Sequence, residues 1–361
     1  MSTLIVEVCE VEEIASHPNA DKIERIRVKN WWCISGIGQY KVGDKVVYVP
    51  PDAVLPLSLS DKWGITKYCV PIKDSKSVRV RASRFRGVSS FGTIQNLDDP
   101  TWSIGLDVKD YYGITKYEPP IKVNDGEAAE PVAAFHAYTS IEALGNFPNV
   151  FEEGEEVIVT EKIHGTNSRV GIVFTKLENG EHEWEFMAGS HSIRRKEFNE
   201  KGQRSKYWWP LSDELKEKLT NLVKNKNVQF AVILFGEIFG ESVQDMTYGQ
   251  KGLGYRLFDI SIDGDYLSYD EMIALASELG IETVPILKRT NYSLKEMDLL
   301  VDGPTTVCDI SSINEPFKGR EGIVIKPKIE RFDPILGGRA ILKYVSVDYH
   351  ERKNKNKTED H

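Results

Sequence analysis

The stretch that decides the fold of the second half of the chain is VIVTEKIHGTNSRVGIV, residues 157–173. Its two apolar runs flank a turn that contains Gly165, and this pattern is typical of two consecutive β-strands. Lys162 stands at the end of the first run. Because lysine is costly to bury, its position indicates either a side chain that reaches solvent from a strand end or an amine with a chemical task.

Runs of the same kind recur through the rest of the chain, and a few amphipathic segments lie between them. The strand-like runs are EWEFMAGSH (183–191), VQFAVILFGEIFG (228–240), YRLFDISI (255–262), EGIVIKP (321–327) and RAILKYVS (339–346). Capping boxes predict helices that begin after Ser268, with Glu271, and after Ser293, with Glu296, and a third helix is expected after Ser212. Antiparallel sheets with flanking helices make this half α+β.

The spacing Lys162-x-x-Gly165 resembles motif I of the covalent nucleotidyltransferases, the superfamily of ATP-dependent DNA ligases, RNA ligases and mRNA capping enzymes. The form EKIHGTN, with His164 where DNA ligases usually carry Asp, is most similar to an RNA ligase. We expect His164 to pack and form hydrogen bonds at the turn, with acid–base catalysis as the weaker alternative. Taken alone, K-x-x-G occurs in many unrelated proteins.

The later motifs of that superfamily follow in order, each on a predicted strand. LFGEIFG provides the acid of motif III, FDI provides motif IIIa, EGIVIKP provides motif IV and ILKYVS provides motif V. The resemblance therefore implies a ligase adenylation domain, similar to ATP-grasp proteins, with Lys162, Lys326 and Lys343 as catalytic residues. The residues implied in ATP binding are Glu161, Ile163, Asn167, Arg194 (less favoured, Arg195), Glu237, Phe258, Lys326 and Lys343. Val345 departs from the K-x-K that several RNA ligases carry in motif V.

The implied chemistry agrees with the residue types. An amine that attacks the α-phosphorus of ATP must be unprotonated, whereas a free lysine has a pKa near 10.4. We expect burial and the charges of Lys326, Lys343 and a bound cation to lower the pKa of Lys162. Glu321 and Glu237 are hard oxygen donors suited to Mg²⁺ or Mn²⁺; alternatively, Glu237 binds the ribose. Phe258 is either a core residue or the side chain that stacks on adenine.

The N-terminal third has a different pattern. HPNADKIERIRV (17–28), followed by ISGIGQYKVGDKVVYVPPDAVLP (34–56), resembles the tRNA-binding kind of OB-fold module, a small β-barrel that binds oligonucleotides. The stretch KDSKSVRVRASRFRG (73–87) is basic; Arg79 and Arg81 and, after a shift, Arg84 and Arg86 alternate as on the outward face of a strand. We predict that this face contacts nucleic acid, with a solvated strand face as the alternative; the residues are Arg79, Arg81, Arg84 and Arg86.

Composition limits the class of protein. The 361 residues include 40% hydrophobic ones and carry a net charge of −9, whereas residues 1–115 carry 15 Lys and Arg against 14 Asp and Glu. No apolar run reaches the roughly 20 residues that span a bilayer, and the four cysteines form no C-x-x-C pair. We expect a monomeric cytoplasmic protein with no membrane contact. The predicted divisions are an OB-like domain (1–115), a linker (116–134), the adenylation domain (135–350) and a disordered tail (351–361).

These observations predict an ATP-dependent RNA ligase that joins 3′-hydroxyl to 5′-phosphate ends through lysyl-AMP and uses Mg²⁺ or Mn²⁺. Its partner would be RNA, as a nicked duplex or an RNA/DNA hybrid, and its task nick sealing and repair. A DNA ligase or a capping-type nucleotidyltransferase remains an alternative, as does a non-catalytic RNA-binding protein.

Overall fold

The computed structural model describes residues 3–29, 31–72, 76–118, 127–176 and 182–352. The chain forms two compact units. The first consists of Met1–Pro120, Glu142–Pro148 and His350–His361, and the second of Ile121–Ile141 and Asn149–Tyr349. Residues 119–126 of the predicted linker and 353–361 of the predicted tail lie outside the described residues. Within the rest of that linker, the backbone of Glu127 and Ala129 bonds to residues 194–196, inside the second unit.

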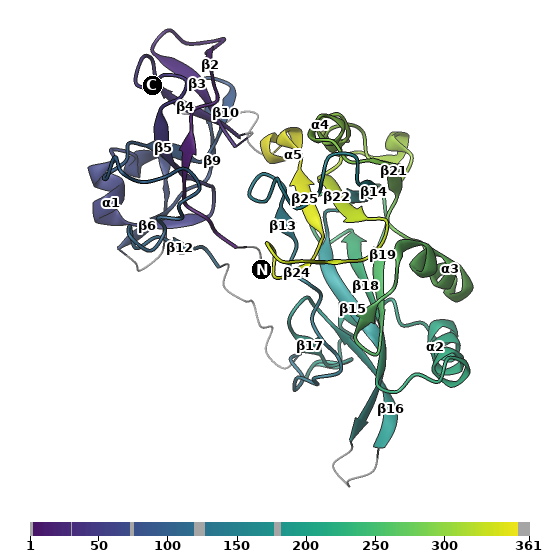
Figure 1. Ribbon diagram of the computed structural model, residues 1–361. Helices are drawn as coiled ribbons and strands as arrows, with labels where there is room; N and C mark the ends of the chain where they lie inside the picture. The colour runs from purple at the N-terminus through teal and green to yellow at the C-terminus, as the bar shows by residue number, and fades with distance from the viewer. Residues whose placement is uncertain (1–2, 30, 73–75, 119–126, 177–181, 353–361) are drawn as a thin grey trace. The chain divides into compact units, whose positions relative to one another are not determined.

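The first unit is built from short antiparallel strands (Figure 1). Three strands pair in the order β1 (Glu7–Glu10), β5 (Lys45–Val49), β11 (Thr93–Gln95), and three more in the order β2 (Glu13–Ser16), β3 (Ile23–Val28), β4 (Trp31–Gly36). A further sheet has the order β12 (Thr115–Lys116), β6 (Ala53–Pro56), β8 (Ser77–Arg79), β7 (Val70–Pro71), and β9 (Ala82–Phe85) pairs with β10 (Val88–Phe91). The remaining elements are α1 (Leu57–Lys62), the 3₁₀ turn η1 (Thr66–Tyr68) and β13 (Glu142–Ala143).

Strand β5 explains why these small sheets hold together. Its side chains alternate between two apolar clusters, with Val47 and Val49 in one and Val46 and Tyr48 in the other. Since neighbouring residues of a strand point to opposite faces, both faces of β5 are buried. Strand β5 therefore joins the two apolar clusters of the first unit.

The second unit contains two antiparallel sheets. The larger has the order β17 (Arg194–Arg195), β16 (His182–Gly189), β15 (Thr166–Lys176), β18 (Ala231–Gly240), β19 (Leu253–Ile262), β20 (Asp265–Tyr266). In the other, neighbouring strands follow the order β25 (Leu342–Val345), β22 (Gly322–Pro327), β14 (Glu156–Lys162), β21 (Ile286–Asn291). The remaining elements are η2 (Lys206–Trp208), α4 (Leu294–Val301), η3 (Ile310–Ser312), α5 (Val347–Glu351) and the hairpin of β23 (Phe332–Asp333) and β24 (Gly338–Arg339).

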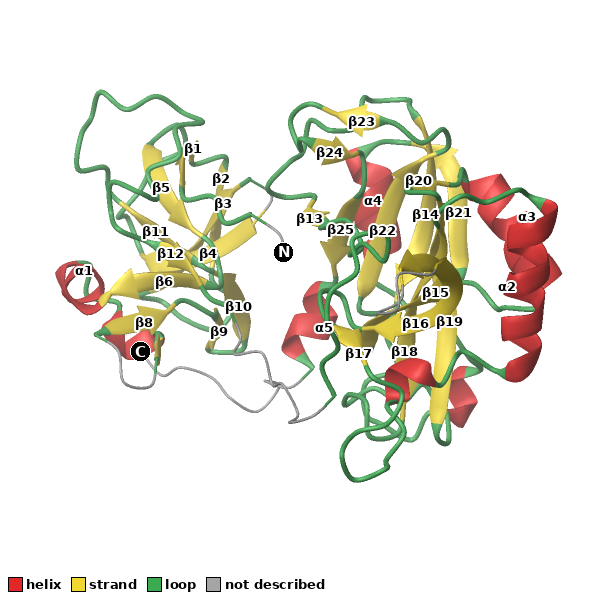
Figure 2. Ribbon diagram, turned by 90° about the horizontal axis from the view of Figure 1, so that it is seen from below, coloured by secondary structure: helices red, strands yellow, loops and turns green. Residues whose placement is uncertain are grey.

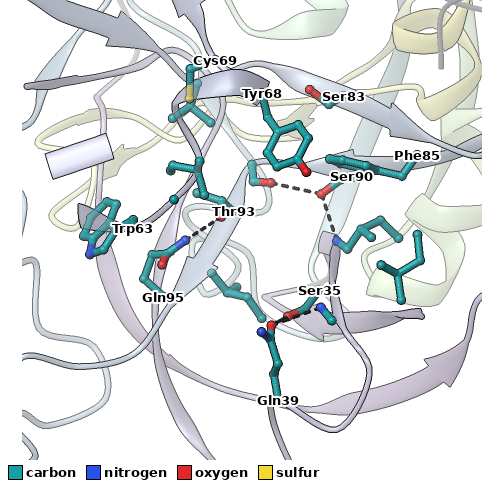
Figure 3. Close-up of a pocket in the computed structure, with 18 of the residues that line it drawn as sticks. Ser35, Gln39, Trp63, Tyr68, Cys69, Ser83, Phe85, Ser90, Thr93 and Gln95 are labelled. Carbon is teal, nitrogen blue, oxygen red and sulfur yellow. Dashed lines mark hydrogen bonds between the residues drawn. The ribbon is translucent and has the colours of Figure 1, made fainter. Parts of the chain in front are cut away.

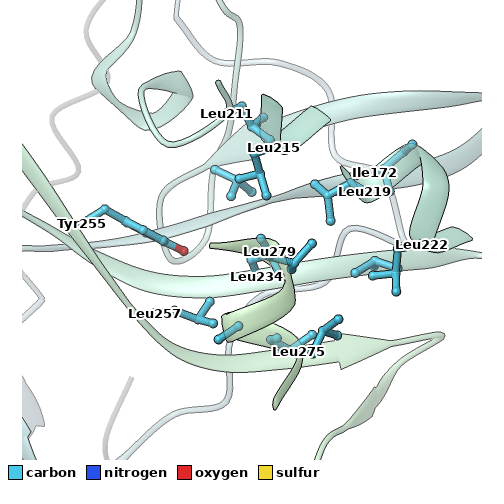
Figure 4. Close-up of a cluster of buried hydrophobic side chains, with 14 of the residues drawn as sticks. Ile172, Leu211, Leu215, Leu219, Leu222, Leu234, Tyr255, Leu257, Leu275 and Leu279 are labelled. Carbon is cyan, nitrogen blue, oxygen red and sulfur yellow. The ribbon is translucent and has the colours of Figure 1, made fainter. Parts of the chain in front are cut away.

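Helices α2 (Asp213–Asn225) and α3 (Tyr269–Leu279) lie side by side and cover one face of the larger sheet (Figure 2). Leucines at helical spacing fill the space between helices and sheet, and Figure 4 shows Leu215, Leu219 and Leu222 of α2 with Leu275 and Leu279 of α3. Burial of each such side chain contributes about 1.5–3 kcal/mol. This apolar cluster joins α2 and α3 to one face of the larger sheet.

The other face of the larger sheet meets the smaller sheet. Val173, Ile233 and Phe235 of the larger sheet share an apolar cluster with Ile341, and Val324 of β22 packs against it. Both sheets therefore contribute side chains to the space between them. The predicted catalytic, ATP-binding and metal-binding residues lie on strands of these two sheets or directly beside a strand end.

The predicted helix starts are confirmed. Ser212 Oγ accepts a hydrogen bond from the Leu215 N–H (3.2 Å), and Ser293 Oγ accepts one from Glu296 N–H (3.1 Å). At Ser268 the capping box with Glu271 is complete, and α3 ends at Gly280 in the left-handed conformation (φ 72°). These caps satisfy backbone groups that the helix ends leave unpaired.

Candidate active site

Lys162 is the last residue of β14, and its neighbour across the sheet is Gly322 at the start of β22. This pairing brings Lys162 beside Glu321, the residue just before Gly322, and Nζ lies 2.8 Å from Glu321 Oε1. Glu321 is 8% exposed. Two residues 159 positions apart are thus joined because β14 and β22 are adjacent strands.

The charges around Lys162 favour its protonated form. Burial acts to lower the pKa of Lys162, but the carboxylates of Glu321 and Glu237 outweigh burial, and the net effect raises the pKa above its ordinary value. In the protein without nucleotide or metal, the expected lowering of the pKa of Lys162 does not occur. The physical reason is that two acidic side chains face the amine, while Lys326 is engaged by another partner.

The two predicted metal ligands both face Lys162. Burial raises the pKa of Glu237 to about 8, only partly opposed by Lys162. Burial also acts to raise the pKa of Glu321, but the attraction of Lys162 and the contact with His164 lower it overall. Glu321 Oε2 is buried and forms no hydrogen bond within the described residues. A buried carboxylate oxygen without a hydrogen bond beside a second carboxylate is a donor set that fits Mg²⁺ or Mn²⁺, which bind through one or two carboxylates plus substrate phosphates.

His164 holds the turn after Lys162 in place. Its Nε2 lies 2.9 Å from Asp245 Oδ1, its Nδ1 lies 2.9 Å from the Tyr349 hydroxyl, and its backbone N–H donates to the Tyr248 hydroxyl (2.7 Å). The ring also lies 3.6 Å from Glu321 Oε2. His164 therefore connects the turn to α5 and to the segment after β18, and none of these three partners was evident in the sequence.

Lys326 of β22 belongs to a buried network centred on Asp259 of β19. Asp259 Oδ2 accepts hydrogen bonds from Lys326 Nζ (2.7 Å), Arg339 (2.9 Å) and the Tyr138 hydroxyl (2.8 Å). The backbone oxygen of Phe258 also accepts from Lys326 Nζ (2.8 Å). Although burial acts to raise the pKa of Asp259, the two cations lower it, so this carboxylate is ionised. Sequence reasoning did not find Tyr138 and Arg339, because neither lies in a recognised motif.

The remaining motif residues lie on neighbouring strands. Phe258 is half-buried, with its ring 4.9 Å from that of Tyr138. Lys343 of β25 is opposite Val324 of β22, and Asn167 of β15 is opposite Glu237 of β18. Asn167 Oδ1 is buried without a hydrogen-bond partner within the described residues. Because this oxygen has no partner and lies beside Glu237, Asn167 is suited to bind a ligand there.

Glu161 points away from Lys162, as alternation along β14 requires. Its carboxylate is buried and accepts hydrogen bonds from Thr305 Oγ1 (2.5 Å), the Thr306 N–H (2.6 Å) and Thr306 Oγ1 (2.7 Å). Ile163 is 3% exposed. Both residues therefore anchor the strand end, and a role in ATP binding stays a prediction.

The predicted arginines are engaged within the protein. Arg194 donates to Glu185 Oε1 (2.5 Å), and its neighbour Arg195 is buried. In the first unit, Arg79 donates to Asp52 Oδ1 through two nitrogens (2.9 and 2.5 Å) and stacks on Tyr117 at 4.0 Å.

The rest of the basic stretch does not form one continuous strand face. Arg84 lies in β9, Arg86 occupies the turn before β10 with φ 43°, and Arg81 lies between β8 and β9. Lys73 and Asp74 lie outside the described residues. The predicted alternation, with its shift between Arg81 and Arg84, is therefore spread over two strands and the turns beside them.

The described residues contain no group of three or more His, Cys, Asp or Glu side chains arranged to hold a metal ion. They also contain no helix with the length and apolar character needed to cross a bilayer.

A lysine amine between two acidic side chains, with further lysines on neighbouring strands, is an arrangement suited to nucleophilic attack on a phosphorus atom. A family model described as RNA ligase matches residues 155–345, and a second, described as an OB-fold domain, matches residues 5–97. The chain belongs to the RNA ligase family, as its motifs predict. The match at the N-terminus confirms the OB-like fold.

Solved structures agree with this assignment over nearly the whole chain. A mutant of the Naegleria gruberi RNA ligase with ATP and Mn is 26% identical, with a TM-score of 0.73, over 98% of this chain and 100% of that one. A mutant of the same ligase with AMP and Mn is 25% identical, with a TM-score of 0.72, over 98% and 99%. The ligase with PPi is 26% identical, with a TM-score of 0.69, over 98% and 100%. No curated protein sequence matches the chain.

Proposed function

We propose that this RNA ligase joins RNA 3′-hydroxyl and 5′-phosphate ends through a covalent AMP adduct on Lys162. The observation that carries the proposal is the position of the Lys162 amine, 2.8 Å from Glu321 in a site lined by residues of both sheets. The solved Naegleria gruberi ligase structures contain ATP, AMP, PPi and Mn, which supports ATP and Mn²⁺ or Mg²⁺ as the nucleotide and metal here.

In the first step, Lys162 Nζ forms a bond to the α-phosphorus of ATP while the bond to the pyrophosphate oxygen breaks and the amine loses a proton. Glu321 Oε1, already in contact with Nζ, is the nearest acceptor for that proton. Lys326 and Lys343 would neutralise charge on the α-phosphate oxygens. A divalent cation held by Glu321 and Glu237 would favour the ionised form of Glu237 and offset the carboxylate charge that now stabilises the ammonium form of Lys162.

The adenylyl group then passes to the RNA 5′-phosphate, and the 3′-hydroxyl displaces AMP from it. We assign adenine stacking to Phe258 and ribose or phosphate contacts to Asn167 and Arg194. Glu161 and Ile163 would take part in ATP binding by holding the strand end that carries Lys162. Nicked duplexes and RNA/DNA hybrids are the proposed substrates, and repair is the proposed task. All four cysteines are free thiols in the structure, which supports the proposal of a cytoplasmic enzyme. We also propose that the enzyme is a monomer.

The proposal is tested by the intact mass of the protein after incubation with ATP and Mg²⁺ or Mn²⁺, with GTP in parallel. The wild type should gain one AMP and Lys162→Met should gain none. Lys328→Met is the matched control, because this lysine lies two residues after Lys326 but is exposed and paired with Glu156. If the wild type gains no AMP on incubation, and pyrophosphate treatment removes no AMP from the protein as purified, the proposal fails. Sealing of nicked all-RNA, hybrid and single-stranded substrates then identifies the substrate.

A further inference from the structure

Arg169 is a buried cation of β15 to which neither the motifs nor the proposed reaction assigns a task. It is 4% exposed. It shares a face of the strand with Asn167, because side chains two residues apart point the same way. Its neighbour across the sheet is Phe235 of β18, just as the neighbour of Asn167 is Glu237. Phe235 lies in the apolar cluster between the two sheets, so Arg169 faces the same space as Glu237.

The guanidinium of Arg169 is held in place by backbone oxygens. Its Nε donates to the Ser190 oxygen (3.1 Å), and its Nη1 donates to the Phe135 oxygen (2.5 Å). The centre of the Phe135 ring lies 4.5 Å from Cζ. Nη2 forms no hydrogen bond within the described residues and, unlike Asn167 Oδ1, is not a fully buried atom. The guanidinium therefore has a fixed orientation and N–H groups left for a ligand.

No carboxylate of the described residues pairs with Arg169. Burial lowers the pKa of its guanidinium to about 10, and no acidic group opposes this effect. The group is still charged at neutral pH, and a buried charge without a counter-charge costs free energy. Lys326 and Arg339 differ, because both donate to Asp259. An anionic ligand between the sheets would supply the counter-charge that Arg169 lacks.

Arg194, the arginine for which the sequence predicted a phosphate contact, has a different environment. It donates to Glu185 Oε1 (2.5 Å) and to the Glu130 backbone oxygen (3.3 Å), so a carboxylate already neutralises its charge. The partners of Arg169 are backbone oxygens, which carry no net charge. Of the two arginines, Arg169 is therefore the one suited to bind a phosphate.

The order of the proposed steps indicates which phosphate Arg169 meets. The Lys162 amine is no longer a cation once it is bonded to AMP. The RNA 5′-phosphate then enters with a charge of about −1.5 to −2 at pH 7. Lys326 is already paired with Asp259 (2.7 Å). The second step thus requires a further cation, one that no carboxylate neutralises.

We propose that Arg169 binds the 5′-phosphate of the RNA strand during transfer of the adenylyl group. The inference rests on the proposed function for the order of the steps. Nη2 donates to a phosphate oxygen while the bonds to Ser190 and Phe135 hold the guanidinium. In this step a 5′-phosphate oxygen forms a bond to the adenylyl phosphorus, the bond to Lys162 Nζ breaks, and the amine regains the proton that it lost in the first step.

The test compares the two steps in Arg169→Met, which keeps an unbranched apolar side chain at the buried position. Formation of the AMP adduct from ATP measures the first step. Transfer from the isolated adduct to a 5′-phosphorylated nick whose 3′ end lacks the hydroxyl measures the second. The first rate should stay near that of the wild type. The second should fall about 10- to 150-fold, the loss expected for a hydrogen bond between charged groups.

A second measurement distinguishes phosphate binding from a purely structural role. The affinities for otherwise identical RNA strands with a 5′-phosphate or a 5′-hydroxyl are compared without ATP. The wild type should prefer the phosphate and Arg169→Met should not, whereas a damaged fold would weaken both strands alike. Arg169→Lys keeps the charge and should recover part of the preference. Arg289→Met is the matched control, because Arg289 is an exposed arginine of β21 paired with Asp270 (2.7 Å).

The outcomes separate the two proposals. If the wild type forms the AMP adduct but Arg169→Met transfers AMP and prefers the 5′-phosphate as the wild type does, the Arg169 assignment is overturned and the ligase proposal stands. Equal losses in both steps would also overturn it, because Arg169 would then act on ATP or on the fold. If the wild type prefers the phosphorylated strand through Arg169 yet forms no adduct, the assignment stands and the ligase proposal fails.

Discussion

The environment of Lys162 poses a specific problem, because a nucleophile must be unprotonated and this one faces two carboxylates. The contact with Glu321 raises the pKa of Lys162. Glu321→Gln removes one negative charge, so the pKa of Lys162 should fall and its reactivity towards an amine reagent should begin at lower pH. Peptide mass spectrometry of Lys162 modification against pH, without nucleotide, measures this shift. Glu278→Gln, on the exposed side of α3, is the control; an unchanged profile in Glu321→Gln would contradict the argument.

Glu237 should make the free energy of unfolding depend on pH. Its folded pKa is about 8, above the ordinary 4.5, so between these values the folded state holds a proton that the unfolded state has released. Stability therefore falls as pH rises through this window. Urea titrations without metal, from pH 5 to about 8.5, measure the free energy of unfolding. Its decrease over this range should be smaller in Glu237→Gln than in the wild type. Glu241→Gln, exposed just beyond β18, should behave as the wild type; if Glu237→Gln does so too, the assignment is wrong.

Asp259 is the residue on which the network around Lys326 depends. It is 2% exposed and accepts from Lys326, Arg339 and Tyr138. Asp259→Asn leaves two cations without their common counter-charge, so unfolding should become easier by about 3–5 kcal/mol. Asp265→Asn, exposed on β20 of the same sheet, should change stability by less than about 0.5 kcal/mol. Similar urea midpoints for the two variants would show that the network contributes little.

At the scale of the element, the turn between β14 and β15 must pass close to β18. A Cβ added at Gly165 would meet the backbone oxygen of Ile238 at 2.2 Å, so Gly165→Ala must displace one of the two strands. Strand separation should cost about 1–3 kcal/mol, and the displaced Lys162 should adenylylate about 100-fold more slowly. At Gly338 an added Cβ meets nothing closer than 4.0 Å. Gly338→Ala should therefore leave both the urea midpoint and the adenylylation rate near the wild-type values.

The elements that sequence predicted correctly are those with a local signal. The helices after Ser212, Ser268 and Ser293 begin as their capping residues indicate, and β14 and β22 follow clear apolar runs. Strand β21 was not predicted, because ILKRTN is mostly polar and exposed and is a strand only through its pairing with β14.

In the site too, residues within sequence motifs were predicted, whereas their partners far away in the sequence were not. The motifs identified Lys162 and its acidic neighbours, and the register of β14 with β22 supports that choice. The partners of His164 and Asp259 lie up to 185 and 121 residues away, and no local pattern connects them. The raised pKa of Lys162 likewise depends on which charges the fold brings nearest.

At the scale of the whole molecule, the assignments place both transfer steps in one of the two compact units. Lys162, Arg169 and their partners belong to the second unit. The first unit has a groove of its own, about 830 Å³ in volume and lined by residues of β3, β4 and β9–β11 (Figure 3). Hydrogen exchange should therefore respond to the nucleotide in the second unit. Adenylylation should slow exchange in β14 and β22 and leave β3 and β4 unchanged, because a ligand protects the structure that holds it.

A 5′-phosphate on a bound RNA strand should protect a different part of the second unit, namely β15 and the residues around Ser190. Compared with a 5′-hydroxyl strand, it should slow exchange there in the wild type but not in Arg169→Met. Lys162→Met provides the control: it should lose the response to ATP with metal that comes from the adduct but keep the response to the 5′-phosphate. If adenylylation protected the groove strands as strongly as β14, or if the 5′-phosphate protected β15 equally with and without Arg169, these assignments would be refuted. Peptide-level mass spectrometry resolves these segments, since the groove strands and β14 are separated by at least 60 residues of sequence.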